Sequence, residues 1–251
     1  ALDENHFELY AQRIENLTEQ DAGIHAEVLL RMLDTDGTII PPGAFLPAAE
    51  RFHLASRIDR WVLRNAIDWL KSLDKTAPAI DMLCINLSGQ SIGDRAFHRQ
   101  AVDMLKDAGE VICAKICIEI TETAAVTNLS DASLFIEQVS VLGVRVALDD
   151  FGAGASSFGY LKNLAVDILK IDGQFIKDLM DDPLDDVAVR CFVDVAKVCG
   201  LKTVAEFVDK PAVLKRVREL GIDYAQGFLL HKPEPIYIAV AQQVVLQKTM
   251  I

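Results

Sequence analysis

Short apolar runs alternate with longer segments of helical periodicity along almost the whole chain. Each run has about the length of a strand, and β-branched residues are frequent in it. The predicted strands are Phe7–Ile14, Ala26–Arg31, Met82–Ser88, Lys115–Thr121, Val144–Asp150, Asp167–Asp172, Lys202–Val208 and Asp223–Phe228. Strands that alternate with helices are typical of a parallel sheet covered by helices. Eight of them predict an α/β fold, the closed (β/α)8 barrel of the TIM type.

Two of the intervening segments show the helical pattern clearly. In the first, the spacing of the apolar side chains predicts one helical face, formed by Ile58, Trp61, Val62, Ala66 and Trp69. The second runs from Val187 to Val198 and is preceded by Asp182 and Pro183. Aspartate is a favoured N-cap and proline a favoured first helical residue, so we expect this helix to begin at Pro183.

The connection between the first two predicted strands is unusually short. It runs from Glu15 to His25 and is rich in polar residues and turn formers. A helical crossover between parallel strands needs about a dozen residues or more. We therefore expect the first strand of the barrel to run antiparallel to the second.

Length and charge limit the classes of function. The chain has 251 residues, of which 51% are hydrophobic, and this suits a single barrel-sized domain over residues 1–251. The formal net charge of −12 argues against polymeric nucleic acid as a partner, since such proteins usually present a basic face. A small phosphorylated ligand is compatible with this charge if metal ions and a few local cations neutralise it.

Cysteine content and hydropathy point to a cytoplasmic domain. Five cysteines are an odd number, and most lie in apolar runs, which predicts buried free thiols in a reducing compartment. The sequence contains neither the ~18 consecutive apolar residues of a membrane span nor a signal peptide at its start. We expect no direct membrane contact by this domain. The missing initial methionine suggests a domain excised from a larger protein, whose other parts could include sensors or a membrane anchor.

Polar residues close most of the predicted strands. They are Glu27 and Arg31, Asn86, Glu119, Asp149 and Asp150, Lys170 and Asp172, Glu206, and Gln226. In a (β/α)8 barrel the carboxyl ends of the strands meet at one mouth. Carboxylates that converge there would repel one another or stay protonated, so bound cations would stabilise them. Such oxygen ligands favour Mg²⁺ or Mn²⁺ over zinc. Taken singly, Glu119 could equally be a solvated residue and Asn86 a turn former.

The most informative segment is Val144–Gly154, in which an apolar run leads Asp149 and Asp150 into a glycine-rich turn. Successive side chains of a strand point to opposite faces, so one carboxylate can enter a pocket while the other leans across its rim. A divalent cation would tolerate both charges. The alternative is that Asp150 only caps the following turn.

Seven motifs, in order, resemble those of the EAL domain, the cyclic di-GMP phosphodiesterase family. The resemblance extends from about Phe7 to Pro235. The motifs are Glu27-Val28-Leu29-Leu30-Arg31, Asn86-Leu87-Ser88, Glu119-Ile120-Thr121-Glu122, Asp149-Asp150-Phe151-Gly152-Ala153-Gly154, Leu169-Lys170-Ile171-Asp172, Ala205-Glu206-Phe207-Val208-Asp209 and Ala225-Gln226-Gly227-Phe228. The resemblance implies a barrel with an antiparallel first strand, in agreement with the short first connection.

The resemblance also implies a metal site. The implied ligands of the first metal ion are Glu27, Asn86, Glu119 and Asp149. Asp149 would bridge to a second metal ion that Asp150 also holds. Glu206 and Asp209 resemble groups that bind the second metal ion and position the attacking water. Lys170 resembles the lysine that contacts this water or the scissile phosphate.

Further positions resemble those that hold the dinucleotide or line its site, namely Gln12, Arg31 and Gln226. The guanidinium group of Arg31 suits a phosphate oxygen. Glu122 resembles the acid that anchors the mobile loop after the paired aspartates, and this loop is associated in the family with dimer contacts. The implied partners are therefore cyclic di-GMP and a second copy of the domain, within a longer protein that carries sensor or cyclase domains.

The implied reaction is hydrolysis of cyclic di-GMP to linear pGpG. Two metal ions ~4 Å apart can share a water, lower its pKa and stabilise the charge that develops during in-line attack on phosphorus. The implied cofactors are two Mg²⁺ or Mn²⁺ ions per site, with Ca²⁺ expected to inhibit.

Four positions depart from the family pattern. Val28 replaces the alanine of the signature, Arg13 stands where many members have proline, Phe207 where many have glycine, and Asp209 where glutamate is usual. The shorter side chain of Asp209 could lengthen a contact by about 1 Å, unless the backbone at Phe207 compensates. The rival hypothesis is therefore a receptor that binds cyclic di-GMP without hydrolysis. Because the principal ligand set is present, we favour the hydrolase over this receptor and over an unrelated Mg²⁺-dependent barrel enzyme.

Overall fold

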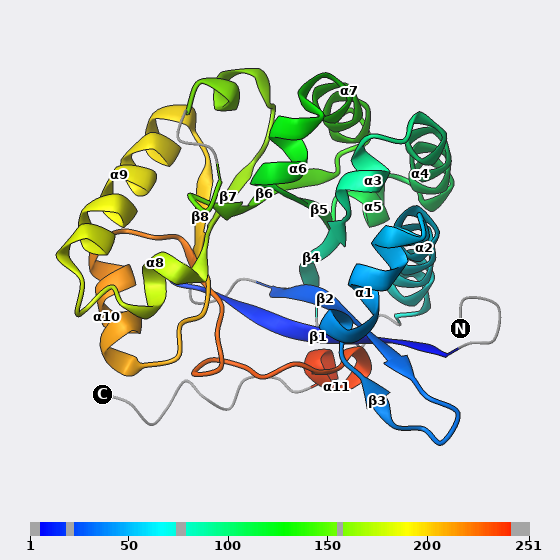
Figure 1. Ribbon diagram of the computed structural model, residues 1–251, viewed down its shortest axis with the longest axis horizontal. Coiled ribbons are helices and arrows are strands. Elements are labelled where there is room, and N and C mark those ends of the chain that lie inside the picture. Colours follow the sequence, from blue (N-terminus) through cyan, green and yellow to red (C-terminus); the bar gives the residue numbers. More distant parts are fainter. Residues whose placement is uncertain (1–5, 19–22, 74–78, 155–157, 242–251) are drawn as a thin grey trace.

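The computed structural model describes residues 6–18, 23–73, 79–154 and 158–241, and ten strands in these ranges form one sheet. Eight of them close into a barrel, because β1 pairs with both β2 and β9. The barrel strands are β1 (Phe7–Asn16), β2 (Ile24–Leu33), β4 (Ile80–Leu87), β5 (Ile116–Thr121), β6 (Arg145–Phe151), β7 (Ile168–Ile171), β8 (Lys202–Ala205) and β9 (Tyr224–Ala225). Helices surround the strands (Figure 1). The predicted (β/α)8 fold is confirmed.

The first strand is antiparallel to both of its barrel neighbours, as the short connection predicts. Along β1 and β2, Phe7 lies opposite Met32 and Ile14 opposite His25. On the other side, Glu15 of β1 lies opposite Ala225 of β9. The remaining barrel pairs, from β2–β4 to β8–β9, are parallel.

Long helices follow several barrel strands and pack on the outside of the sheet. They are α2 (Ala55–Ser72), α4 (Arg95–Ala108), α7 (Leu129–Ser140) and α9 (Pro183–Cys199). Shorter helices are α1 (Pro42–Arg51), α3 (Gly89–Ile92), α5 (Glu110–Cys113), α6 (Glu122–Thr127), α8 (Gly173–Lys177), α10 (Pro211–Glu219), α11 (Ile236–Ala241) and the 3₁₀ helix η1 (Phe158–Asn163).

The predicted helical faces are confirmed. In α2, Ile58, Val62 and Ala66 are buried against the barrel, and the two tryptophans of the face are partly buried. Helix α9 begins at Pro183, and the carboxylate of Asp182 accepts a hydrogen bond of 2.8 Å from the Leu184 N–H. A capped helix start of this kind stabilises the first turn, because it satisfies an otherwise unpaired donor.

The prediction of buried thiols is confirmed for three cysteines and wrong for two. All five are free, and Cys84, Cys113 and Cys117 are buried, but Cys191 and Cys199 are exposed. Both exposed thiols belong to α9, whose outward face also carries Leu184, Val187 and Val198. An apolar run in a surface helix is therefore not buried on every side, and the run alone does not distinguish the two faces.

The last two barrel strands end earlier than predicted. β8 ends at Ala205 and β9 at Ala225, so the polar residues that follow lie in irregular backbone. Phe207 has a φ of 53°, in the left-handed region that extended chains do not use. The Val208 N–H still donates to the Gln226 carbonyl, so the two irregular segments remain side by side.

Two features near the ends of the sheet are absent from the sequence prediction. β3 (Ile39–Ile40) pairs with the end of β2, and β10 (Glu234–Pro235) pairs with β1. These strands have two residues each, too few for a periodic pattern. Helix α11 follows β10 and lies beside β1 (Figure 1). Among the described residues, no helix has the length and apolar character that a membrane span requires.

Candidate active site

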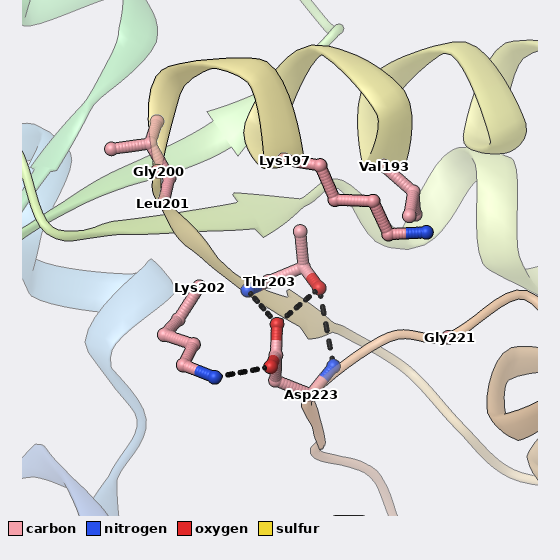
Figure 2. A pocket seen from close by; sticks show the side chains of 8 residues that line it. All are labelled: Val193, Lys197, Gly200, Leu201, Lys202, Thr203, Gly221 and Asp223. Carbon is pink, nitrogen blue, oxygen red and sulfur yellow. Dashed lines mark hydrogen bonds and ion pairs between the residues drawn. The ribbon is translucent and has the colours of Figure 1, made fainter.

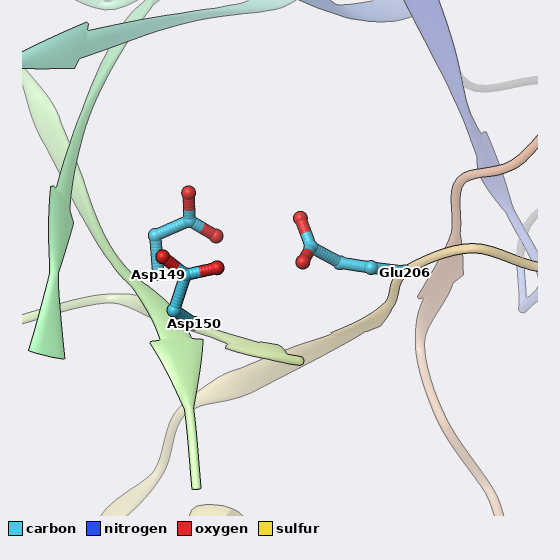
Figure 3. Close-up of side chains that lie close together, drawn as sticks. All are labelled: Asp149, Asp150 and Glu206. Atoms are coloured by element: carbon cyan, nitrogen blue, oxygen red, sulfur yellow. The ribbon is translucent and has the colours of Figure 1, made fainter. Parts of the chain in front are cut away.

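The paired aspartates lie at a bulge near the end of β6. Between the pairs Leu148–Leu169 and Phe151–Ile171, β6 contains one residue more than β7. Asp150 takes up this residue with a φ of 54°, a conformation that aspartate tolerates better than most residues. Strict alternation along a strand would point the two carboxylates to opposite faces, but the bulge changes the direction of Asp150. Both are directed toward Glu206 (Figure 3), with one oxygen of each acid within 4.8 Å of the others.

Lys170 lies at the centre of the barrel mouth. It is the third residue of β7, and its side chain is 1% exposed. The ammonium lies 2.9 Å from Glu206 Oε1, 3.0 Å from Glu119 Oε2 and 3.1 Å from Asp149 Oδ1. Burial alone would lower the pKa of Lys170, but the surrounding carboxylates outweigh it and raise the pKa well above its ordinary value. The lysine is therefore a buried cation shared by acids of β5, of β6 and of the segment that follows β8.

Several acids of this group are held in a desolvated environment. Glu119 of β5 is fully buried, and burial raises its pKa well above the usual range despite the neighbouring Lys170. Burial also raises the pKa of Glu206 to about 8, opposed by Lys170 and reinforced by Asp149. Burial also raises the pKa of Asp150, and the charge of the adjacent Asp149 raises it further. The acids are thus more numerous than one ammonium can neutralise.

This donor set fits divalent cations. Glu119 Oε1 is buried and has no hydrogen-bond partner in the described part of the chain. Asp149, Asp150 and Glu206 supply a second group of converging oxygens. Hard carboxylate oxygens around a negatively charged mouth are the ligands that Mg²⁺ and Mn²⁺ prefer.

Glu27 of β2 is held by amide groups from both sides. Asn86 Nδ2 donates to Glu27 Oε1 at 2.7 Å, and Gln226 Nε2 donates to Glu27 Oε2 at 2.6 Å. Lys170 Nζ lies 3.7 Å from Oε2. The structure thus brings Glu27 and Asn86 together with the acids of β5 and β6, as the strand-end argument predicts.

A buried aspartate of α2 fixes the backbone next to Asn86. Asp59 Oδ2 accepts hydrogen bonds from the Ser88 N–H at 2.8 Å, the Ser88 hydroxyl at 2.6 Å and the Ser91 hydroxyl at 2.6 Å. Burial raises the pKa of Asp59, whereas these three donors oppose the shift. The contact anchors the turn between β4 and α3, on which the position of Asn86 depends.

Glu122 holds the start of the loop after the paired aspartates. Its Oε2 accepts hydrogen bonds from the N–H groups of Gly152 at 3.0 Å and Gly154 at 3.3 Å, and its Oε1 accepts one from the Tyr160 hydroxyl at 2.6 Å. A Cβ at Gly152 would lie 2.7 Å from the Phe175 ring, and its φ is 97°. Glycine is therefore required at this turn. The geometry supports the loop-anchoring role implied by the resemblance.

Two predicted site residues make no hydrogen bond or ion pair with the acid cluster in the described part of the chain. The Arg31 guanidinium lies over the Tyr10 ring, 5.2 Å from its centroid, and donates to the Leu30 carbonyl. Asp209 is exposed, and in the described ranges its carboxylate makes no hydrogen bond or ion pair. The structure thus brings Asp149, Asp150 and Glu206 together without Asp209.

Phe207 stands where many family members have glycine, and the backbone turns at this residue, directly after Glu206. Its positive φ explains why glycine is favourable at this position. The ring is 56% exposed, leaves no room for a Cβ at Gly173, and lies 4.2 Å from Lys177 Nζ. Arg13, by contrast, is directed away from the mouth, since its Nε donates to the Ala239 carbonyl of α11 at 2.7 Å.

A separate pocket lies among the amino-terminal ends of β8 and β9 (Figure 2). Asp223 organises it, accepting hydrogen bonds from Lys202 Nζ at 2.8 Å and from the Thr203 N–H at 2.9 Å. The pocket therefore lies at the end of the barrel opposite the acid cluster. Residues at this end of a (β/α)8 barrel normally serve stability rather than chemistry.

The family profile of the EAL domain matches residues 1–233. This chain belongs to the EAL domain family. It is 39% identical to cyclic di-GMP phosphodiesterase PdeB of Shewanella oneidensis and 36% identical to cyclic di-GMP phosphodiesterase PdeF of Escherichia coli, in each case over 94% of the chain. It spans only 27% and 31% of these two relatives. The EAL signature is present here with valine in place of alanine, and Val28 is buried.

Solved EAL structures have the same fold. The FimX EAL domain from Pseudomonas aeruginosa bound to c-di-GMP superposes with a TM-score of 0.83 at 30% identity, covering 94% of this chain and 93% of the other. The PaMucR phosphodiesterase in complex with c-di-GMP gives a TM-score of 0.82 at 31% identity, covering 95% and 96%. The expected family is therefore confirmed.

Sequence reasoning missed three residues that support the site of this EAL domain, namely Asp59, Tyr160 and His231. Asp59 lies within a helical pattern, which does not show that its side chain is buried. The spacing of Ser88 and Ser91, typical of a helix cap, was the available signal. Tyr160 lies in a short 3₁₀ helix outside any periodic segment. His231 follows the last predicted strand, and its carbonyl accepts the amide N–H of Gln12 at 2.9 Å.

Proposed function

We propose that this EAL domain hydrolyses cyclic di-GMP to linear pGpG with two divalent metal ions, Mg²⁺ or Mn²⁺, in its barrel mouth. The observation that carries the proposal is the convergence of Glu119, Asp149, Glu206 and Glu27 on the buried Lys170. Relatives that match 94% of the chain are named cyclic di-GMP phosphodiesterases, which supports the same substrate.

The residues divide into two ligand groups in this proposal. Glu27, Asn86, Glu119 and Asp149 would hold the first ion. Asp149 would also reach the second, together with Asp150 and Glu206, whose oxygens already converge. When bound, the two ions lower the pKa of a shared water and stabilise negative charge at phosphorus during in-line attack.

The chain itself supplies positioning and charge. Lys170 keeps its proton because carboxylates surround it, so its ammonium can donate to the attacking water or to a phosphate oxygen. Arg31 offers a second cation on β2, suited to a phosphate oxygen of the dinucleotide.

The direct test is incubation of the purified protein with cyclic di-GMP and Mg²⁺, followed by chromatographic analysis of the products. We expect pGpG to accumulate, and chelation of the metal with EDTA to stop the reaction. Saturable binding of cyclic di-GMP with no pGpG formed would instead establish the receptor.

One observation favours the receptor as the second candidate. Asp209, which would help to position the water, is exposed and lies outside the acid group. A structural neighbour, the FimX EAL domain, is described as bound to c-di-GMP. A domain with intact binding and poor water positioning would show nucleotide affinity with little turnover.

We further propose that the domain acts as a homodimer within a longer signalling protein that carries sensor or cyclase domains. The small share of its relatives that the chain spans supports the longer protein. The loop anchored by Glu122 is the segment that the family resemblance associates with dimer contacts, and its anchoring hydrogen bonds are formed here.

Metal identity should decide between turnover and inhibition. Mg²⁺ and Mn²⁺ should support hydrolysis because a compact set of carboxylates and one carboxamide can impose near-octahedral geometry. Ca²⁺ is larger and accepts irregular coordination, so it should bind and inhibit. Rates of pGpG formation with each ion at matched concentration check this, and equal rates with Ca²⁺ and Mg²⁺ would contradict the proposed site.

Restoring the usual acid at position 209 should raise activity. Because the Asp209 side chain is exposed and unpaired in the described structure, an added methylene meets no crowding. We expect Asp209→Glu to increase kcat up to about tenfold with little change in KM, since the gained contact matters mainly in the transition state. Steady-state kinetics measure both constants. A lower kcat would show that the turned backbone at Phe207 already compensates for the shorter acid.

A further inference from the structure

Hydrogen bonds restrain both oxygens of the Glu27 carboxylate. Each oxygen accepts one amide N–H, from Asn86 at 2.7 Å and from Gln226 at 2.6 Å. Gln226 is 5% exposed, so this hydrogen bond is sheltered from water. With both oxygens restrained, the plane of the carboxylate is fixed.

Gln226 is itself restrained from the neighbouring strand. Its Nε2 lies 3.2 Å from Gln12 Oε1, and Gln12 Nε2 donates to the His231 carbonyl at 2.9 Å. Gln12 lies directly opposite Glu27 in the β1–β2 register. The amide groups thus form a chain from His231 through Gln12 and Gln226 to Glu27, on the antiparallel side of the barrel.

We infer that Gln226 is a positioning residue for Glu27, and that Gln12 positions Gln226 in turn. The inference rests on the proposed function, in which Glu27 is a metal ligand. It adds to the resemblance, which implies only that both glutamines hold the dinucleotide or line its site. Their N–H donors are directed into the protein, toward Glu27 and the His231 carbonyl. A partner that orients a metal-bound carboxylate typically changes metal affinity about 10- to 100-fold when it is removed.

The first test is the variant Gln226→Met, which keeps the side-chain volume and removes the donor. We expect Mn²⁺ affinity, measured by isothermal titration calorimetry, to fall about 10- to 100-fold. Cyclic di-GMP affinity at saturating Ca²⁺ should change less than about threefold. The matched control is Gln138→Met, at an exposed glutamine of α7, which should leave both affinities unchanged.

A second variant tests the relay. Gln12→Ala should weaken Mn²⁺ binding by a smaller factor than Gln226→Met, because the bond from Gln226 to Glu27 remains. In the Gln226→Met background, Gln12→Ala should cause no further loss of Mn²⁺ affinity. Residues that act through one another show such non-additivity, whereas independent sites add. Additive losses of Mn²⁺ affinity would show that Gln12 does not act through Gln226.

A measurement without metal separates this inference from the proposed function. Urea midpoints in EDTA for Glu27→Gln, Gln226→Met and the double variant form a double-mutant cycle. Non-additive midpoints support the coupling of Gln226 to Glu27 even if the wild type binds no Mn²⁺, a result that would overturn only the proposed hydrolase. Additive midpoints overturn the inference. The inference is also overturned if Gln226→Met keeps the wild-type Mn²⁺ affinity and loses cyclic di-GMP affinity tenfold. Gln226 would then contact the nucleotide.

Discussion

Asp149→Ala is expected to reduce pGpG formation by ~10³-fold or more, a loss of at least ~4 kcal/mol of transition-state stabilisation. Asp149 is the acid that both proposed ligand groups share. It contacts Lys170 at 3.1 Å and converges with Asp150 and Glu206. Its removal should therefore disturb both metal ions together. Glu27→Ala, which removes a ligand of the first ion only, should cause a loss of the same order.

Nucleotide binding should be much less sensitive to this change. Cyclic di-GMP can still be held through Arg31 and base contacts, particularly with Ca²⁺ present. Single-turnover rates and calorimetric binding measured on the same preparation separate the two effects. Asp103→Ala, at an exposed aspartate of α4, is the matched control and should have wild-type kinetics. Turnover near the wild-type rate in Asp149→Ala would show that this residue is not a metal ligand.

The fold could be predicted because two simple periodicities carry it. Apolar runs such as those of β5 and β6 are buried on both faces, so they are recognisable without any alternation. The helical face of α2 is equally clear. The short first connection even gave the direction of β1. The two-residue strands β3 and β10 could not be predicted, because their pairing depends on long strands already in place.

The location of the site could also be predicted, but the orientation of its side chains could not. Polar residues at successive strand ends must share one mouth in a parallel barrel, which placed Glu119, Asp149 and Lys170 together. The expected pair of one buried and one rim carboxylate is found in Asp149 and Asp150, but the bulge that sets the direction of Asp150 was not predicted. Local sequence does not reveal an extra residue in a strand, because the pairing with the neighbouring strand defines it.

The contacts of the glutamines show the same limit. Gln12 and Gln226 are separated by more than 200 residues, and both are bound within the chain of amides that reaches Glu27. Residue type alone suits a dinucleotide equally well, since an amide can donate and accept. Only the closure of the barrel, with β1 between β2 and β9, places the two amides side by side.

Lys170→Met is expected to destabilise the protein strongly in EDTA, lowering the free energy of unfolding by about 3–5 kcal/mol. The ammonium is fully enclosed and lies within 3.1 Å of Glu119, Asp149 and Glu206. Without it, these acids must remain charged and unpaired or bind protons, and both cost free energy in a buried site. Urea denaturation gives the difference from wild type. Lys106→Met, at an exposed lysine of α4, should change it by less than about 0.5 kcal/mol.

Divalent ions should recover part of this loss, because they supply positive charge to the same carboxylates and bind the folded state alone. We therefore expect Mn²⁺ to raise the unfolding free energy of Lys170→Met above its value in EDTA, while pGpG formation stays low because no ammonium remains to contact the attacking water or the phosphate. Stability and turnover would then separate in one variant. If Lys170→Met were as stable as wild type in EDTA, these carboxylates would not depend on the lysine for their charge balance, and its role would be confined to the reaction.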